Sequence, residues 1–405
     1  MSFQQGLSGL NAAAKNLDVI GNNVANANTV GFKQAVATFS DVFAASMGGS
    51  GGTQVGIGTQ ITGVSQQFTQ GNITVTNNPL DVAINGQGFF RMSSGGDISY
   101  SRNGGFLLDK DGYIIDGNGN NLTGFTAVNG VVVPGVLGNL QLSSTDLLPK
   151  ATENLRVGVS LASDDPVLPT AGFVATDPSS YNFSTASSCY DSLGQSHTLT
   201  LYFNKTAANT WDVNTYVDGV AANGAGVTTL TFDTSGMVSG APAPTNLLKT
   251  VALANGAAPL ALTMDYGSMT QFGSGFGVNA LSQDGFASGR LSGYSIDADG
   301  VVLGRYSNGQ AQTLGQIALA NFTNPQGLQP LGNSMWSESS SSGVPLTGAP
   351  GSASLGMLQS LAKEDSNVDL TAELVNMITA QRVYQANAQS IKTQDALLQT
   401  LVNLR

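Results

Sequence analysis

The sequence predicts a mainly β protein with α-helical termini. The N- and C-terminal helices are expected to pair as a coiled-coil-like inner domain, followed by two all-β outer domains, one inserted in the other. Apolar residues recur at helical spacing at both ends of the 405-residue chain. Between them, short β-branched and aromatic runs are separated by Asn-Gly and Asp-Gly turn dipeptides.

The first predicted helix begins at the N-terminus. Its apolar residues lie four and three positions apart, which places them on one face close to an a/d heptad seam. They are Phe3, Leu7, Leu10, Ala14 and Leu17. The helix is expected to end near Gly21, because an Asn-rich stretch over residues 22–28 follows and Asn side chains compete for backbone hydrogen bonds.

The middle of the chain, from about residue 70 to 335, has no helical period. The predicted strands include 80–84, 112–115, 197–203 and 211–217. The turn dipeptides are Asn85-Gly86, Asp111-Gly112, Asn129-Gly130, Asp218-Gly219 and Asn308-Gly309. A segment rich in Asp and Pro at 164–178 and a Gly-, Ala- and Pro-rich stretch at 240–245 suggest that one β domain is inserted within another.

The C-terminal part reads as a Ser/Gly/Pro-rich linker over 337–354 and then a long helix from near Asp369. Its apolar seam, interrupted by Gln381 and Asp395, consists of Leu370, Leu374, Met377, Tyr384, Ala388, Ile391, Leu398 and Val402. Few charges flank this stripe, so it needs cover, and the N-terminal stripe is the complement the sequence offers. We predict that the two stripes form the assembly seam.

These patterns give predicted domain boundaries. Residues 1–30 and 366–405 form a terminal helical assembly domain, joined by an extended linker region at 31–70 and 337–365. Residues 71–146 and 285–336 form an inner β domain, and 147–284 an inserted outer β domain.

Composition excludes several classes of function. Charged residues make up only 10% of the chain and the net charge is −11, which argues against a nucleic-acid partner. The single cysteine, Cys189, excludes an intrachain disulfide, although an intersubunit link through it stays open. No run reaches the roughly 18 apolar residues of a membrane span, and the N-terminus lacks the basic and apolar regions of a cleaved signal.

No catalytic, cofactor or metal site is predicted. One histidine, His197, and one cysteine cannot build the usual zinc site, and His197 is interpreted as an ordinary strand residue. The runs 109–112 and 297–300 resemble the start of a calcium loop without its spacing, and are interpreted as hairpin turns. The glycines of 273–277 lack the lysine of a phosphate loop. The chain is therefore not expected to be an enzyme.

Three blocks of sequence resemble the axial proteins of the bacterial flagellum, the rod-and-hook family. They are LSGLNAAAKNLDVIGNNVANANTVGFKQ (7–34), GNITVTNNPLDVAINGQGFF (71–90) and SNVDLTAELVNMITAQRVYQANAQSIKTQDALLQTLVNL (366–404). Within that family the chain is most similar to the hook members, through CYDSLGQSHTLTLYF (189–203) and DGFASGRLSGYSIDADGVVLGRYSNGQ (284–310).

The resemblance implies export through the flagellar type III apparatus without a cleaved signal, and stacking with further copies into a curved, extracellular helical tube. Such a tube acts as a universal joint that transmits torque from rod to filament. The implied partners are the chain itself, a hook cap protein, a distal rod protein, a hook–filament junction protein and a hook-length control protein. Membrane insertion is not implied.

Two other readings stay open on sequence alone. One is a distal-rod-type axial subunit with an enlarged middle. The other is a secreted β-rich carbohydrate-binding protein or glycosidase, which would need exposed aromatic residues and a carboxylate pair in a cleft. The only two tryptophans, Trp211 and Trp336, lie far apart in the sequence.

Overall fold

The computed structural model describes residues 2–42, 56–142, 146–169, 172–224, 227–239 and 247–403. The chain divides into two compact units. Unit 1 contains residues 1–144, 293–305 and 311–405, and unit 2 contains residues 145–292 and 306–310. Each unit is described separately.

Both ends of the chain are helical, as predicted, and both helices belong to unit 1. Helix α1 spans Ser2–Ala25, so it continues past Gly21 to the Asn-rich turn. Helix α2 spans Leu370–Asn403. Asp369 caps α2, because its Oδ1 accepts hydrogen bonds from the backbone amides of Thr371 and Ala372 at 2.8 and 3.1 Å.

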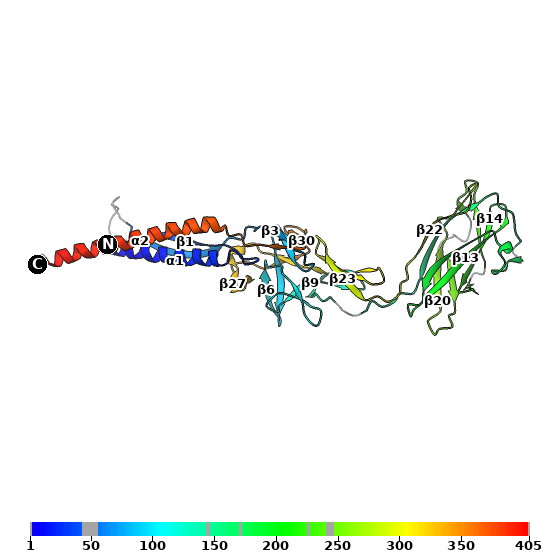
Figure 1. The fold of residues 1–405 in the computed structure, drawn as a ribbon, viewed down its shortest axis with the longest axis horizontal. Helices are drawn as coiled ribbons and strands as arrows, with labels where there is room; N and C mark the ends of the chain where they lie inside the picture. The colour runs from blue at the N-terminus through cyan, green and yellow to red at the C-terminus, as the bar shows by residue number, and fades with distance from the viewer. Residues whose placement is uncertain are drawn as a thin grey trace. The chain divides into compact units, whose positions relative to one another are not determined.

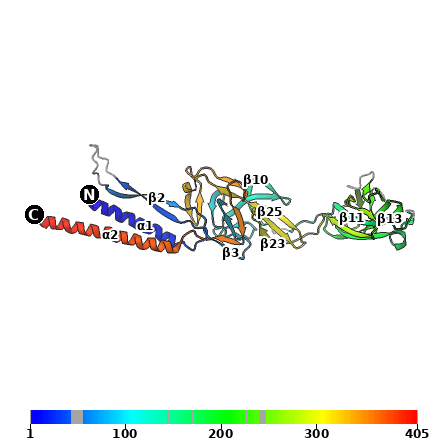
Figure 2. The ribbon, with the colours of Figure 1, turned by 90° about the horizontal axis from the view of Figure 1, so that it is seen from above.

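The two helices lie side by side, and a two-stranded antiparallel sheet accompanies α1 (Figures 1 and 2). Its strands are β1 (Ala35–Val42) and β2 (Gly58–Gln66). Figure 2 shows this sheet on the side of α1 away from α2. The predicted pairing of the terminal helices is therefore confirmed, with a β-hairpin added that the sequence did not predict.

The body of unit 1 is a 13-stranded sheet system. Its strands are β5 (Phe89–Ser94), β6 (Asp97–Ser101), β7 (Leu107–Leu108), β8 (Ile114–Ile115), β9 (Asn121–Val128), β10 (Val131–Asn139), β23 (Leu291–Ile296), β24 (Val301–Tyr306), β25 (Ala311–Ile317), β26 (Leu319–Asn321), β27 (Gln329–Gly332), β28 (Met335–Ser337) and β29 (Leu346–Gly348). A short 3₁₀ helix spans Pro325–Gly327. One core cluster contains Phe90, Met92 and Ile317, and a second contains Phe89, Tyr100 and Trp336.

Two small antiparallel pairs tie early segments of unit 1 to late ones. They are β3 (Ile73–Val75) with β31 (Ala362–Glu364), and β4 (Val82–Asn85) with β30 (Met357–Ser360). The strand leading into α2 is thus held by a segment nearly 300 residues earlier in the chain.

Unit 2 has two six-stranded sheets around one core. The first sheet contains β11 (Asn154–Ala162), β16 (Asn223–Gly224), β19 (Leu247–Val251), β20 (Leu260–Asp265), β21 (Thr270–Phe272) and β22 (Gly277–Gln283). The second contains β12 (Phe183–Tyr190), β13 (Ser196–Ala207), β14 (Thr210–Val217), β15 (Val220–Ala221), β17 (Thr228–Phe232) and β18 (Val238–Ser239). A 3₁₀ helix spans Pro178–Ser180. The buried Trp211 donates its indole N–H to Gln271 Oε1 at 2.7 Å and so links the two sheets.

The linker predicted at 337–365 is corrected by the structure. This segment contributes β29, β30 and β31, and Leu358, Ala362 and Glu364 are buried. Its serines are held by local bonds; the amide and hydroxyl of Ser342 both donate to the carbonyl of Ser339, at 3.2 and 2.9 Å. Small polar residues that bond to nearby backbone form ordered turns as readily as free linkers.

Candidate functional site

The two terminal helices carry large apolar side chains that the rest of the chain leaves exposed. Helices α1 and α2 are antiparallel, because Gly6 lies against Ile391 and Asn387, whereas Gln34, just beyond α1, binds Glu373. A Cβ atom on Gly6 would meet Ile391 Cγ1 at 3.0 Å, and one on Gly9 would meet Asn387 Nδ2 at 2.9 Å. Glycine at these two positions lets the helices approach closely.

The contact line between the helices is made mainly of small and polar residues, together with Ile20, rather than of the predicted apolar stripes. On α1 it contains Gly6, Ala13 and Ile20, spaced seven apart and buried. On α2 it contains Glu373 and Ala380, also seven apart and buried, and then Asn387, which is half-buried. The seven-residue spacing of Gly6 and Ala13 is the signal in the sequence for the α1 part of this line.

The predicted stripe residues lie beside that line and remain accessible. On α1, Phe3 and Leu7 are 46% and 44% exposed, and Leu10, Ala14 and Leu17 are half-buried. On α2, exposed positions are Leu370, Leu374, Tyr384 and Leu398, and half-buried positions are Met377, Ala388 and Ile391. The side chain of Val402 lies outside the described residues.

The prediction that these stripes form the contact between α1 and α2 of one chain is therefore wrong, except at Ile391, which lies against Gly6. The physical reason is that bulky apolar residues mark where a helix needs cover, whereas close helix pairing favours small residues. An apolar period in sequence does not say whether the cover comes from the same chain. As an assembly seam between copies, the stripes stay a prediction.

Both stripes lie on the same side of the helix pair. With about 100° of rotation per residue, each stripe is turned by roughly 50–80° from the contact line of its helix. Viewed from the N-terminus of each helix, both stripes are rotated in the same direction away from the contact line. Because the helices are antiparallel, rotations in the same direction place both stripes on the same side of the pair. The opposite side faces β1 and β2; there Asn23 exchanges two hydrogen bonds with the backbone of Ala35, at 2.7 and 2.9 Å. The stripes thus form one continuous accessible face.

A buried ionic cluster joins this helical end to the body of unit 1. We call Lys33, Arg102 and Glu364 the junction cluster. Lys33 Nζ lies 2.7 Å from Glu364 Oε1, and Arg102 Nη1 lies 3.1 Å from Glu364 Oε2, with side chains at most 3% exposed. Burial lowers the pKa of Lys33 and of Arg102, and the Glu364 carboxylate partly opposes that shift.

Amide side chains extend the junction to the start of α2. The amide N–H of Gln34 donates to Asn367 Oδ1 at 2.7 Å, and its side-chain Nε2 donates to Glu373 Oε1 at 2.6 Å. Asn367 Nδ2 in turn donates to the carbonyl of Gln67 at 2.7 Å. These bonds fix where both helices leave the body. Sequence reasoning missed them because the partners are far apart in the chain.

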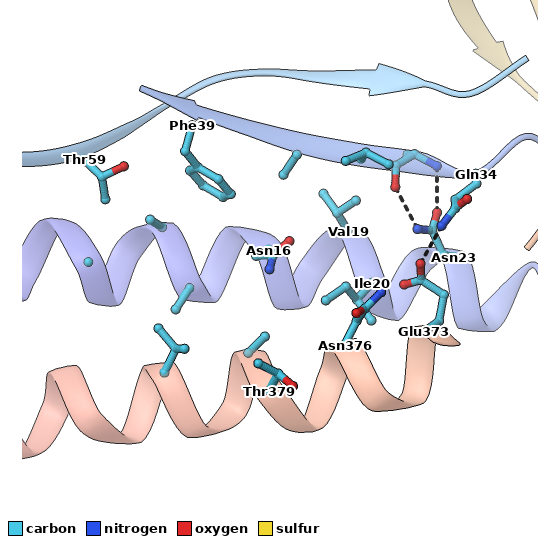
Figure 3. A pocket seen from close by; sticks show the side chains of 18 of the residues that line it. Asn16, Val19, Ile20, Asn23, Gln34, Phe39, Thr59, Glu373, Asn376 and Thr379 are labelled. Atoms are coloured by element: carbon cyan, nitrogen blue, oxygen red, sulfur yellow. Dashed lines mark hydrogen bonds between the residues drawn. The ribbon is translucent and has the colours of Figure 1, made fainter. Parts of the chain in front are cut away.

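A groove of about 600 Å³ runs along the helix pair on the side opposite the stripes. Figure 3 shows α1 between strand β1 and helix α2, with Val19, Phe39 and Ile20 among the lining residues. Of the described lining residues, Glu373 alone is charged. Its side chain is buried, and its Oε2 has no hydrogen-bond partner among the residues that the structure describes. We call this surface the terminal groove.

The histidine, the cysteine and the two calcium-loop-like runs all take part in contacts within strands and turns. His197 lies on β13 between two carboxylates, with Nδ1 2.6 Å from Asp218 Oδ2 and Nε2 3.2 Å from Asp191 Oδ2. Cys189 is a buried strand thiol whose pKa is raised to about 11 by burial. Both calcium-loop-like runs are turns, since Gly112 and Gly300 donate to the carbonyls of Asp109 and Asp297 at 2.9 Å.

The described residues contain neither a metal-binding cluster nor a membrane-spanning helix. Within them there is no group of three or more His, Cys, Asp or Glu side chains placed to hold a metal ion. No helix among them is long and apolar enough to cross a membrane.

Comparison with known proteins matches four family models along the chain. They are described as flagella basal body rod protein (residues 3–33), flagellar hook protein FlgE/F/G D1 domain (83–147), flagellar basal body protein FlaE D2 domain (160–286) and flagellar basal body rod FlgEFG protein C-terminal (358–404). Together they cover both chain ends and both units.

Two relatives that match over the full length of the chain have the same name. The chain is 44% identical to the flagellar hook protein FlgE of Escherichia coli and 43% identical to that of Salmonella typhimurium, each over all of both chains. The crystal structure of Helicobacter pylori flagellar hook protein FlgE2 has a similar fold, with a TM-score of 0.53 and 15% identity over 72% of this chain and 99% of that one.

Proposed function

This chain belongs to the flagellar hook protein family, and from that premise we propose that it is a structural subunit that polymerises into the bacterial flagellar hook. In the polymer it forms a curved helical tube, a flexible joint that passes torque from rod to filament. The observation that carries the self-assembly step is the apolar face formed by both terminal helices on one side of their contact line.

The stripes supply the driving force for assembly. Fully burying one leucine stabilises a contact by about 1.5–3 kcal/mol, and the face contains several large apolar residues at or near half exposure. Neighbouring copies that cover this face with their own terminal helices bury little charge, since Asp395 is the one charged residue that interrupts the α2 stripe.

The predicted domains have separate roles in the proposed polymer. We assign assembly to residues 1–30 and 366–405, an inner tube-side β layer to 71–146 and 285–336, and an outer β layer to 147–284. The junction cluster holds the assembly helices at a fixed exit from the body, so that docking in the polymer is transmitted to the β layers. Catalysis has no part in this role.

We also propose where the subunit acts and which proteins it contacts. The subunit leaves the cell through the flagellar type III export apparatus without a cleaved leader and becomes part of the extracellular hook. It meets the hook cap protein during growth, the distal rod protein at its base, and the hook–filament junction protein at its end. A hook-length control protein sets when growth stops.

Electron microscopy of basal bodies from cells that lack this gene tests the proposal, with the gene restored on a plasmid as the control. Rods that stop without a hook are the expected result. Truncated rods would assign the chain to the rod instead, and intact hooks would refute a structural role in the hook.

A further inference from the structure

The terminal groove contains a carboxylate that the folded chain satisfies only in part. Glu373 is 3% exposed, and Figure 3 shows its carboxylate pointing from α2 toward α1 and the groove. Its Oε1 accepts a hydrogen bond from Gln34 Nε2 at 2.6 Å, whereas the buried Oε2 accepts none from the described residues. Because a buried carboxylate oxygen without a donor is costly, this oxygen favours a ligand that brings its own N–H group.

The walls of the terminal groove are apolar and incompletely covered. Val36 and Phe39 of β1 are each 39% exposed and Val383 of α2 is 48% exposed, although all three line the groove. The volume of about 600 Å³ lies within the roughly 300–1,000 Å³ that is usual for sites of small organic ligands. Such sites combine apolar walls with a few fixed polar groups, which is the composition found here.

The charge of the groove selects a cation. Glu373 is the one charged residue among the described lining residues, so no basic side chain there would attract an anion. A single carboxylate is a poor metal site, and the described part of the chain has no metal-binding cluster. An organic ammonium group fits, because its three N–H donors can bond both Glu373 Oε2 and the side-chain oxygen of Asn376, three residues further on the same helix face.

We propose that the terminal groove binds a small organic ammonium compound, with its amine on Glu373 Oε2 and its apolar body against Val19, Ile20 and Ala380. An apolar chain of about 10 Å reaches from the level of Glu373 to that of Ala380, since seven residues of helix span this length. The site is formed within one subunit, so it requires no particular arrangement of copies and does not depend on the hook assignment.

A compound in this site contacts three elements at once: α1 through Val19, α2 through Glu373 and β1 through Phe39. These elements separate when unit 1 unfolds, so the compound binds the folded subunit and not the unfolded chain. Binding of this kind raises the melting temperature as the ligand concentration rises above the dissociation constant. Thermal melts therefore give a second readout beside direct binding.

Calorimetric titration of the purified full-length subunit tests the site with three probes of similar shape. They are 4-phenylbutylamine, 4-phenylbutan-1-ol and 4-phenylbutyrate, which at neutral pH are a cation, a neutral molecule and an anion. We expect the amine to bind at least about tenfold more tightly than the alcohol, because it adds a charge-assisted hydrogen bond, and the carboxylate not to bind measurably. Equal affinity for amine and alcohol would overturn the assignment of a cation site.

Two substitutions separate the carboxylate from the apolar walls. Glu373→Gln keeps an oxygen that can accept from Gln34, and it should weaken amine binding at least about tenfold while changing alcohol binding less than about twofold. Ala37→Phe places a ring into the groove from β1 and should weaken both probes at least about tenfold. The matched control is Asp395→Asn, which removes an exposed carboxylate from the same helix outside the groove and should leave both affinities unchanged.

The outcomes separate the ligand site from the role in the hook. Amine binding that survives either Glu373→Gln or Ala37→Phe would place the ligand elsewhere and overturn the site. The absence of binding by all three probes at millimolar concentration, with no rise in melting temperature, would overturn it as well. Neither result changes the hook assignment, which is tested on basal bodies.

Discussion

Replacing Glu364 by glutamine tests whether the junction cluster holds the helical end on the body. The carboxylate is fully buried and contacts both Lys33 and Arg102, which are also buried. Its removal leaves two buried cations without a counter-charge, and breaking a buried pair in this way costs about 3–5 kcal/mol. Replacing Lys33 by methionine in the same chain removes one of those cations and should restore part of the loss.

The assay uses the placement of the two tryptophans, Trp336 in the core of unit 1 and Trp211 in the core of unit 2. In a Trp211→Phe background, fluorescence reports on unit 1 alone. A loss of 3–5 kcal/mol at a slope near 2.5 kcal/mol per M lowers the urea midpoint of unit 1 by about 1–2 M.

Asp18→Asn is the matched control, because the Lys15–Asp18 pair is about two-thirds exposed on both sides. It should change the free energy of unfolding by less than about 0.5 kcal/mol. A Glu364→Gln midpoint equal to that of Asp18→Asn would refute the argument that this cluster holds the junction.

Substitutions at Gly21, His197 and Leu10 test three other parts of the structure. Gly21→Ala on α1, where no heavy atom beyond the chain neighbours and the adjacent backbone of α1 lies within 4 Å of the added methyl, should stabilise unit 1 by about 0.5–1 kcal/mol, whereas Gly9→Ala should not, because Asn387 lies at 2.9 Å; equal effects in urea unfolding would contradict the close helix contact. His197 should stabilise unit 2 most at about pH 5–6. Burial lowers the pKa of His197, but Asp218 and Asp191 raise it by more, so the pKa in the folded protein lies above its usual value. The stabilisation of unit 2 by His197 is therefore present below about pH 6.5 and is lost as pH rises through the pKa of the folded protein. Burial raises the pKa of Asp191, but Asn255 and His197 bring it down to about 2, and His197 lowers that of Asp218, so the carboxylate contribution is lost as pH falls from about 4 toward 2. Thermal melts of wild type and His197→Gln should therefore differ most near pH 5–6, and a difference independent of pH would count against the network. Leu10→Glu places a charge on the α1 stripe, and it should abolish polymer while leaving the free energy of unfolding of unit 1, measured in urea, within about 0.5 kcal/mol of wild type; a destabilised monomer would mean that the stripe is internal packing.

The sequence predicted local structure well where one residue type decides the backbone. Asn129-Gly130 forms the β9–β10 turn with φ values of 52° and 78°, and Asp218-Gly219 turns β14 into β15 in the same way. Asn85-Gly86 has a different role, since it joins β4 and β5, which pair with other strands and not with each other. A turn dipeptide predicts a reversal or a bend but does not identify the strands that pair.

Contacts that depend on distant partners could not be predicted. Lys33 and Glu364 are 331 residues apart, and neither lies in an apolar pattern that would indicate burial. The helix pairing was predicted from apolar periodicity, but its face was not, because Gly6 and Gly9 carry no side chain that such a pattern detects. The unpartnered oxygen of Glu373 is likewise visible only once β1, α1 and α2 are placed together.

We propose that the exposed apolar face of the terminal helices drives assembly, and a single charge placed on that face tests this. Hooks are counted by electron microscopy on cells whose only hook subunit carries Leu374→Glu, beside cells carrying Gln389→Glu, an exposed polar position on the same helix outside the stripe. We predict rods without hooks for Leu374→Glu, with exported monomer in the medium, and normal hooks for Gln389→Glu. Normal hooks with Leu374→Glu would show that this face does not drive assembly.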